Sequence, residues 1–357
     1  MKTEPAIGKA ALSEILFREY GLAVERLDFL PTDWTAYCYI VHCANGERYF
    51  LKLTGSGGLV PYAIGDPAFY LPLTYELYTQ GILPQIAHPI PARDGRLMLT
   101  GNGYRLILFN YIEGHLVGFG EMPENILARL AGLLGILHRS TSQITLDYVL
   151  QERFALSFEA DLLHSLDVLQ GVTAADRQGK QDLRDLLLPR QGELLGLLRR
   201  LKELQAQAVA ADKAQVFCHT DLHGGNLMLD GQDHLYILDW EGALLAPPEQ
   251  DLFFFAWRDD FWQAFLPAYE REFGPAHLEG AVFGFYFSRR NLEDLTDWVV
   301  RILNDNTEAG QYAADLQGIL QDCLSSWPYL EKNIRNIAAR LSTREYHHAP
   351  HKNHPHP

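Results

Sequence analysis

The sequence predicts an α+β fold in which a small sheet domain precedes a larger helical domain. Two tight-turn signals, Asn45-Gly46 and Asn102-Gly103, each lie between β-rich runs in the first part of the chain. Further along, apolar residues recur at helical spacing, and one β-rich island at 215–240 interrupts them. The 357 residues are 47% hydrophobic and 21% charged, which is ordinary globular composition with enough length for a sizeable core.

The first domain begins with a helix and a hairpin. The opening stretch MKTEPAIGKAALSEILFREYGL has the spacing of an amphipathic helix and does not resemble a secretory leader. YCYIVHCANGERYFLKL then holds two β-rich runs around Asn45-Gly46, the strongest short hairpin signal. Lys52 is therefore expected near the end of the second strand of this hairpin.

A helix and a second hairpin complete the first domain. After a long loop that contains Pro61, Pro67 and Pro72, the stretch LTYELYTQGIL has helical spacing and carries Glu76 in its middle. RLMLTGNGYRLILFNYIEG predicts another hairpin, whose second strand leads into a short linker at 110–114. We place the first domain boundary at this linker.

The second domain is mostly helical. PENILARLAGLLGILHRS carries an apolar stripe, and most of the chain from there to about residue 213 follows the same pattern. The β-rich island turns at Asp230-Gly231, and aromatic-rich helices return after Pro247. The last stretch, REYHHAPHKNHPHP, holds five of the fourteen histidines in a proline-interrupted tail, which predicts disorder.

Charge, hydropathy and cysteine usage narrow the classes of function. The formal net charge of −15, without clustered Lys and Arg, argues against a nucleic-acid partner and suits a cationic small molecule. No apolar run approaches the roughly 18–20 residues that cross a bilayer, so no membrane partner is expected. The four cysteines form no CxxC pair and are expected to be reduced thiols in the cytoplasm.

One polar constellation lies in and after the β-rich island. Asp221 and Asn226 bracket a loop between two short strands, and the turn at Asp230-Gly231 returns the next strand so that Asp239 lies beside Asn226. Oxygen ligands that include an amide suit Mg²⁺, which takes further oxygens from nucleotide phosphates. The constellation therefore predicts ATP or GTP as cofactor and places Asp221 toward an acceptor hydroxyl.

These residues resemble a known family. The pattern H-x-D-x-x-x-x-N followed by an apolar strand that ends in D-W runs from His219 to Trp240. It is similar to the signature of aminoglycoside phosphotransferases and choline-kinase-like enzymes, distant relatives of protein kinases. The resemblance extends through YILDWEGALLAPPEQDLFF and RRNLEDL, covers about Lys52 to Ile302, and is greatest to the spectinomycin phosphotransferase type.

The resemblance implies a protein-kinase-like fold of two lobes. The first would be a nucleotide-binding lobe over 1–109, with a small antiparallel sheet and one helix. A hinge at 110–114 would lead to a helical catalytic and substrate-binding lobe over 115–345, and then to the tail at 346–357.

Carried over position by position, the resemblance also implies roles for the polar residues. Asp221 matches the catalytic aspartate, and Asn226 and Asp239 match the Mg²⁺ ligands. Lys52 matches the lysine that binds the α- and β-phosphates, and Glu76 the acid that orients it. Backbone groups around the start of the hinge would contact the adenine, at Phe109, Asn110, Tyr111 and Ile112.

Further residues of the resemblance have supporting roles. Asp251 matches an aspartate at a helix start that braces the catalytic loop. His219 is expected to hold that loop by hydrogen bonds, since phosphoryl transfer gives a histidine there no required proton to move. His223 lies where protein kinases often carry a lysine, so it is a candidate γ-phosphate contact or else a solvent-exposed loop residue. Gly224 and Gly225 are expected to permit a tight loop.

The segment that would cover the nucleotide departs from the expected pattern. The turn LPTDWTAY has no glycine, where such a loop often has several. Backbone N–H and hydroxyl groups of Thr32, Asp33 and Thr35 are the candidates for phosphate contact there.

Acidic residues are candidates for binding an amine-bearing acceptor. They are Glu241, next to the D-W pair, and three acids of a late helix, Glu293, Asp294 and Asp297. In the alternative interpretation, the two arginines of RRNLEDL pair with the first two of these helix acids, four residues away, on a solvated helix surface.

Other classes of function remain open on the sequence alone. His219, Asp221 and His223 alternate as ligands of a zinc hydrolase would, but that reading leaves Asn226 and Lys52 unexplained. A catalytically idle kinase fold is a second alternative. For a kinase, an aminoglycoside or aminocyclitol such as spectinomycin is the first choice of acceptor, and choline, homoserine or a sugar derivative is the next.

Overall fold

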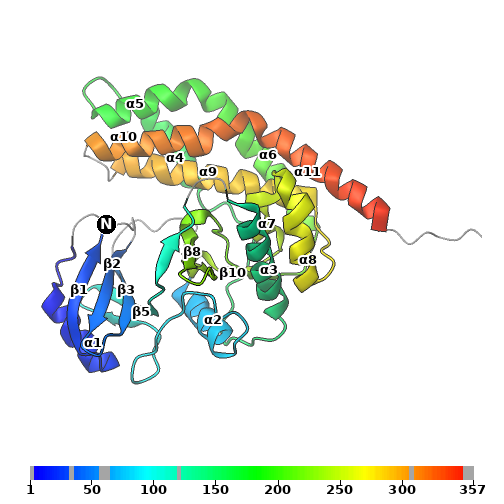
Figure 1. Cartoon of the computed structure of the whole chain (residues 1–357). Coiled ribbons are helices and arrows are strands. Elements are labelled where there is room, and N and C mark those ends of the chain that lie inside the picture. Colours follow the sequence, from blue (N-terminus) through cyan, green and yellow to red (C-terminus); the bar gives the residue numbers. More distant parts are fainter. Residues whose placement is uncertain (1–3, 32–35, 56–64, 119–121, 305–308, 349–357) are drawn as a thin grey trace, which may run out of the picture. The chain divides into compact units, whose positions relative to one another are not determined.

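The computed structural model describes the chain in five segments: 4–31, 36–55, 65–118, 122–304 and 309–348 (Figure 1). By contacts between residues the chain divides into two compact units. The first, unit 1, comprises 1–151, 216–245 and 264–274, and the second, unit 2, comprises 152–215, 246–263 and 275–357. The lobe limits expected at 110–114 and 345 remain predictions.

Unit 1 contains a five-stranded antiparallel sheet of order β1-β2-β3-β5-β4 (Figure 1). Its strands are β1 Val24–Leu30, β2 Tyr37–Cys43, β3 Arg48–Gly55, β4 Leu99–Gly101 and β5 Tyr104–Asn110. The hairpins predicted at Asn45-Gly46 and Asn102-Gly103 are both confirmed. Asn102 and Gly103 have φ of 52° and 77°, the left-handed pair that a two-residue type I′ turn requires.

The helix predicted at the start of the chain is also confirmed. Helix α1 spans Lys9–Tyr20 and packs beside β1 (Figure 1). Its fully buried Leu12 and Leu16 enter the apolar core on one face of the sheet. The helix ends at Gly21, which has the left-handed conformation common after helices.

Helix α2 begins earlier than the sequence predicts. It spans Pro67–Thr79, so the expected loop is wrong from Pro67 onward. The Asp66 side chain accepts a hydrogen bond from the Ala68 N–H, and Pro67 occupies the first turn, where its missing N–H costs nothing. Pro72 lies inside the helix, and the buried apolar face of α2 offsets the backbone hydrogen bond that this proline removes.

A second sheet in unit 1 carries the β-rich island. It contains β6 Gly114–Leu116, β8 Leu227–Asp230 and β9 Leu235–Ile237, in the order β6-β8-β9. The antiparallel pairing of β8 with β9 confirms the hairpin at Asp230-Gly231. β7, Val216–Cys218, pairs with β10, Leu244–Ala246. The predicted helix α3, Glu124–Ser140, buries its apolar stripe and packs against α8, Leu266–Phe273.

Unit 2 is helical. Its α-helices are α4 Glu159–Gln170, α5 Gln178–Leu187, α6 Gln191–Ala210, α7 Glu249–Ala256, α9 Gly280–Asn304, α10 Ala309–Gly318 and α11 Trp327–His348. The 25-residue α9 packs against α4, α6, α7 and α11. Helix α11 includes the first three residues of the expected tail, and 349–357 lie outside the described residues. Among the helices described, none combines the length and apolar character that crossing a bilayer requires.

Candidate active site

The polar constellation predicted from the sequence is assembled within unit 1. Leu227 of β8 pairs with Ile237 of β9, and just beyond this pair the Leu238 N–H donates to the Asn226 carbonyl at 2.8 Å. Asp239 is the next residue, so the hairpin returns it beside Asn226. The backbone of the two strands therefore fixes the spacing between the loop and the strand end.

Asn226 is bonded directly to Asp221. Its side-chain Nδ2 donates to the Asp221 carbonyl at 2.9 Å and to Asp221 Oδ2 at 3.1 Å. Asn226 is only 8% exposed, so these bonds are largely shielded from water. Because the amide nitrogen is used in this way, Oδ1 is the atom with which Asn226 can ligate a cation.

His219 is built into the backbone of the same loop. Its Nε2 donates to the Leu238 carbonyl at 2.7 Å, and its Nδ1 accepts from the Asp221 N–H at 3.3 Å. The ring is fully buried and lies edge-on to Trp240, with centroids 4.8 Å apart. Both ring nitrogens therefore hold the segments that carry Asp221 and Asp239.

Two site positions have left-handed backbone conformations. Thr220, immediately before Asp221, has φ of 77°, which is rare for a β-branched residue, and Asp239 has φ of 56°. The Thr220 hydroxyl donates to the Gly242 carbonyl at 2.9 Å and helps to hold this conformation. Such backbone strain is characteristic of functional loops that the surrounding structure keeps in one shape.

Gly224 allows the segment after β6 to lie against the loop that runs from Asp221 to Asn226. The Gly118 N–H donates to the Gly224 carbonyl at 2.9 Å, and a Cβ on Gly224 would lie 1.8 Å from the Gly118 carbonyl oxygen. No side chain fits at this distance. The glycine therefore provides close backbone packing.

Lys52 of β3 lies between two carboxylates. Its Nζ is 3.0 Å from Glu241 Oε1 and 3.4 Å from Asp239 Oδ1. The Lys52 and Glu241 side chains are 7% and 13% exposed, whereas Asp239 is 43% exposed. Burial raises the pKa of the neighbouring Tyr70 hydroxyl, and the negative charge of Glu241 adds to this.

The structure does not place Glu76 with Lys52. Glu76 lies half-buried on α2 and accepts a hydrogen bond from Gln80 of the same helix at 2.8 Å. Within the described residues, Glu241 is the glutamate that pairs with Lys52, a role that the sequence interpretation did not give it. Its position two residues after Asp239 is the sequence signal that could have suggested this contact.

Side chains brace the segment that the sequence predicts as the hinge, at Asn110 and at Tyr111 and Glu113. Asn110 Oδ1 accepts from the His88 N–H at 2.8 Å. The Arg48 guanidinium lies 4.5 Å above the Tyr111 ring and donates to Glu113 at 2.6 Å. Phe109, Asn110, Tyr111 and Ile112 are all partly exposed, and their predicted contact with adenine stays a prediction. Thr32, Asp33 and Thr35 lie outside the described residues.

The acids predicted on the late helix belong to unit 2. The pairs four residues apart are confirmed, with Arg289 3.6 Å from Glu293 and Arg290 2.9 Å from Asp294. The first pair is buried rather than solvated, and burial raises the pKa of Glu293 to about 7. Asp297 is partly buried on the same helix. Asp251 is fully buried in the first turn of α7.

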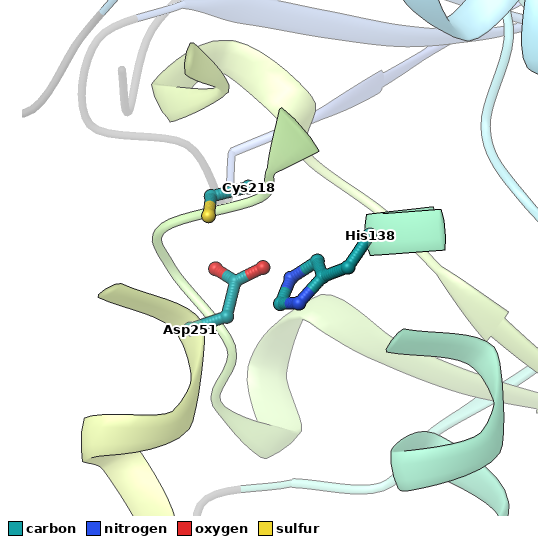
Figure 2. A group of neighbouring side chains, drawn as sticks. All are labelled: His138, Cys218 and Asp251. Atoms are coloured by element: carbon teal, nitrogen blue, oxygen red, sulfur yellow. The ribbon is translucent and has the colours of Figure 1, made fainter. Parts of the chain in front are cut away.

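The strand that precedes the loop ends in a buried polar cluster. Cys218 ends β7, and its sulfur lies within 4.8 Å of a ring nitrogen of His138 on α3 (Figure 2). His138 Nδ1 lies 2.8 Å from the Tyr269 hydroxyl. In the part of the chain that the structure describes, His219, Asp221 and His223 do not bring three ligand atoms within 4.8 Å of one another, as a zinc site would require.

The sequence itself matches a known family over most of this region. Residues 27–283 match APH, the phosphotransferase enzyme family. The chain belongs to the phosphotransferase enzyme family. Protein StrN of Streptomyces griseus is 26% identical over 229 residues, which are 61% of this chain. The chain spans only 65% of the length of that relative.

Solved structures share the fold of this phosphotransferase family member. Spectinomycin phosphotransferase APH(9)-Ia, in complex with ADP and spectinomycin, has a TM-score of 0.67 at 18% identity, covering 95% of this chain and 99% of that one. Choline kinase LicA from Streptococcus pneumoniae has a TM-score of 0.52 at 16% identity, covering 87% and 98%. The predicted protein-kinase-like α+β fold is therefore confirmed.

Proposed function

We propose that the protein is an ATP-dependent kinase that transfers the γ-phosphate to a hydroxyl of a small molecule. The observation that carries this proposal is the connected set in unit 1 in which Asn226 bonds Asp221 and Lys52 lies 3.4 Å from Asp239. A phosphotransfer site needs a carboxylate that faces the acceptor, oxygen ligands for a metal ion and a positively charged side chain that binds the phosphates. Membership of the phosphotransferase family supports the same reaction.

The residues present fit a nucleotide with Mg²⁺. Asn226 Oδ1 and the half-exposed Asp239 carboxylate are hard oxygen donors, the type that Mg²⁺ prefers. Bound there, Mg²⁺ would neutralise phosphate charge during transfer. Lys52 would exchange part of its contact with the carboxylates for contact with the α- and β-phosphates, and the segment Phe109–Ile112 would receive the adenine.

Asp221 would orient the acceptor hydroxyl and accept its proton. As the acceptor oxygen bonds to the γ-phosphorus, the bond from that phosphorus to the β-γ bridging oxygen breaks and ADP leaves. An aspartate with an ordinary pKa near 3.9 is too weak to remove an alcohol proton early, so the proton moves late and orientation is the main contribution. The short hydrogen-bonded loop around Asp221 supplies that orientation.

For the acceptor, we propose an aminoglycoside or aminocyclitol antibiotic. The net charge of −15 favours a cationic molecule, and spectinomycin phosphotransferase shares the fold over 95% of the chain. The resemblance to choline kinase LicA favours an endogenous amino alcohol as the second candidate. The cytoplasmic location expected from the sequence belongs to this proposal, and it is consistent with the four cysteines, which are buried and form no disulfide in the described structure.

A coupled ADP-release assay tests both the proposed kinase reaction and the proposed class of acceptor. Purified protein with ATP and Mg²⁺ is offered spectinomycin, aminoglycosides, choline, homoserine and sugar alcohols, and an expressing strain is tested for resistance to each antibiotic. We expect Asp221→Asn to lower kcat by at least about 10²-fold while ATP still binds. Asp233→Asn, in the exposed β8–β9 turn, is the matched control. Full transfer activity in Asp221→Asn would refute the assignment, and ATP binding without transfer to any acceptor would favour an idle kinase fold.

A further inference from the structure

His223 lies in the middle of the catalytic loop, and the position of its ring decides which ring nitrogen accepts a hydrogen bond. Nδ1 faces the Gly225 N–H at 3.1 Å. A backbone N–H can only donate, so Nδ1 is the unprotonated, accepting nitrogen. In this tautomer the ring proton is on Nε2, which is therefore a hydrogen-bond donor.

The Nε2 atom of His223 points to the carboxylate of Asp221. It lies 3.4 Å from Asp221 Oδ2, the same oxygen that accepts from Asn226 Nδ2 at 3.1 Å. The two nitrogens, which lie 3.4 Å from each other, thus converge on one oxygen of Asp221. Contacts of this length commonly tighten when a substrate completes an active site.

The backbone around His223 holds the ring in this position. His223 is the residue before the single turn Gly224–Asn226 and caps it through Nδ1. Its own N–H donates to the Asp221 carbonyl at 3.2 Å. The same residue therefore closes the turn on one side of its ring and reaches the carboxylate on the other.

We propose that His223 is a positioning residue for Asp221, acting through the Nε2–H to Oδ2 hydrogen bond. With Oδ2 held by two donors, the carboxylate cannot rotate about its Cβ–Cγ bond, and Oδ1 keeps one direction relative to the loop. Orientation of this carboxylate is what phosphoryl transfer asks of it. The inference rests on the proposed function of Asp221, and it differs from both sequence alternatives for His223, a γ-phosphate contact and a solvent-exposed loop residue.

Two substitutions at His223 test the roles of the two ring nitrogens separately. In His223→Asn the amide oxygen can still accept from the Gly225 N–H as a turn cap, but the shorter side chain cannot reach Asp221. In His223→Gln an amide N–H can reach the position of Nε2, while the cap is lost. The full-length variants are compared by thermal denaturation, by ATP binding and by ATP turnover with Mg²⁺. Turnover is measured with the panel member most active in the ADP-release assay and with water as acceptor.

We expect His223→Asn to keep the wild-type Tm and KM for ATP and to lose about 10- to 100-fold in kcat, as expected for one hydrogen bond to a charged group. His223→Gln is expected to have a lower Tm than His223→Asn but a higher kcat. Wild-type kcat in His223→Asn would overturn the inference. So would a raised KM for ATP with unchanged kcat, which would indicate a phosphate contact, or parallel losses of Tm and kcat in both variants, which would indicate a structural role alone.

The same experiment distinguishes this inference from the proposed function. If Asp221→Asn is inactive and His223→Asn is fully active, the positioning role fails and the kinase assignment stands. If Asp221→Asn is itself fully active, the kinase assignment fails, and the positioning role fails with it.

Discussion

The Lys52 ammonium of β3 lies 3.0 Å from the Glu241 carboxylate, and both side chains are almost entirely buried. Taking an ion pair out of water costs several kcal/mol per charge, and the attraction between the partners offsets this only when geometry is good. Such a pair contributes little net stability, so its value lies in fixing where the lysine points. In this protein the residue after the D-W pair, and not helix α2, provides that fixed point.

The first prediction compares the two glutamates. We expect Glu241→Gln to raise KM for ATP about tenfold or more, because the lysine loses the charged partner that orients it. A tenfold rise corresponds to about 1.4 kcal/mol of binding free energy. Glu76→Gln should leave KM for ATP within about twofold, because the hydrogen bond that the described structure gives the Glu76 side chain goes to Gln80, just after the same helix, and not to Lys52. Steady-state kinetics on the three proteins measure this. A larger effect from Glu76→Gln than from Glu241→Gln would contradict the pairing seen here.

A magnesium titration identifies what Glu241 does. If Glu241 acts through Lys52, Glu241→Gln leaves the half-saturating Mg²⁺ concentration unchanged, whereas Asp239→Asn raises it. An equal rise in both variants would make Glu241 a metal ligand and not a partner of the lysine.

The second prediction concerns Gly224. We expect Gly224→Ala to lower the free energy of unfolding by about 1–3 kcal/mol, the usual cost of an added methyl group in a packed site. It should also lower kcat, because the backbone that must move carries Asp221 and Asn226. Gly231→Ala is the control, since a Cβ there meets nothing within 4 Å. Denaturant unfolding and turnover assays give both quantities, and equal stability of the two variants would show that the loop adjusts freely.

The third prediction concerns the buried Glu249 of α7. Burial raises its pKa to about 7, against the opposing effect of Lys213 at 3.8 Å, while Glu249 Oε1 accepts the Glu279 N–H at 2.9 Å. Between about pH 4.5 and 7, the folded protein therefore holds a proton on Glu249 that the unfolded chain, in which this pKa is 4.5, has already released. Folding stability consequently falls as pH rises from about 4.5 to 7 and then levels off, with a slope no steeper than about 1.4 kcal/mol per pH unit.

Thermal unfolding from pH 5 to 8 tests this sign. Glu249→Gln keeps an acceptor for the Glu279 N–H but cannot ionise. The Tm of the variant minus that of the wild type should therefore increase as pH rises. The exposed Glu193→Gln should follow the wild-type curve at every pH. A constant difference between Glu249→Gln and wild type would mean that Glu249 does not titrate in this range.

Local chemistry carried much of the fold. Asn45-Gly46 and Asn102-Gly103 predicted two hairpins because asparagine and glycine accept the left-handed conformations of tight turns, with positive φ at Gly46 in the first turn and at Asn102 and Gly103 in the second. The sequence predicted α3 because the spacing of its apolar residues matches one buried helix face. The sequence did not predict the start of α2, because Pro72 indicates a loop locally. The packing that buries the apolar side chains of α2 comes from distant parts of the chain.

The sequence by itself determined the family and the residue types of the site, since a short loop and the hairpin that follows it place Asp221, Asn226 and Asp239 within one local segment. Only the tertiary structure decided the contacts between distant segments. Lys52 and Glu241 are far apart in the chain, and the packing that brings them together left Glu76 on its own helix. The direction of the His223 ring was likewise decided by the folded loop, because a side chain takes the rotamer that its surroundings permit and residue order alone does not specify it.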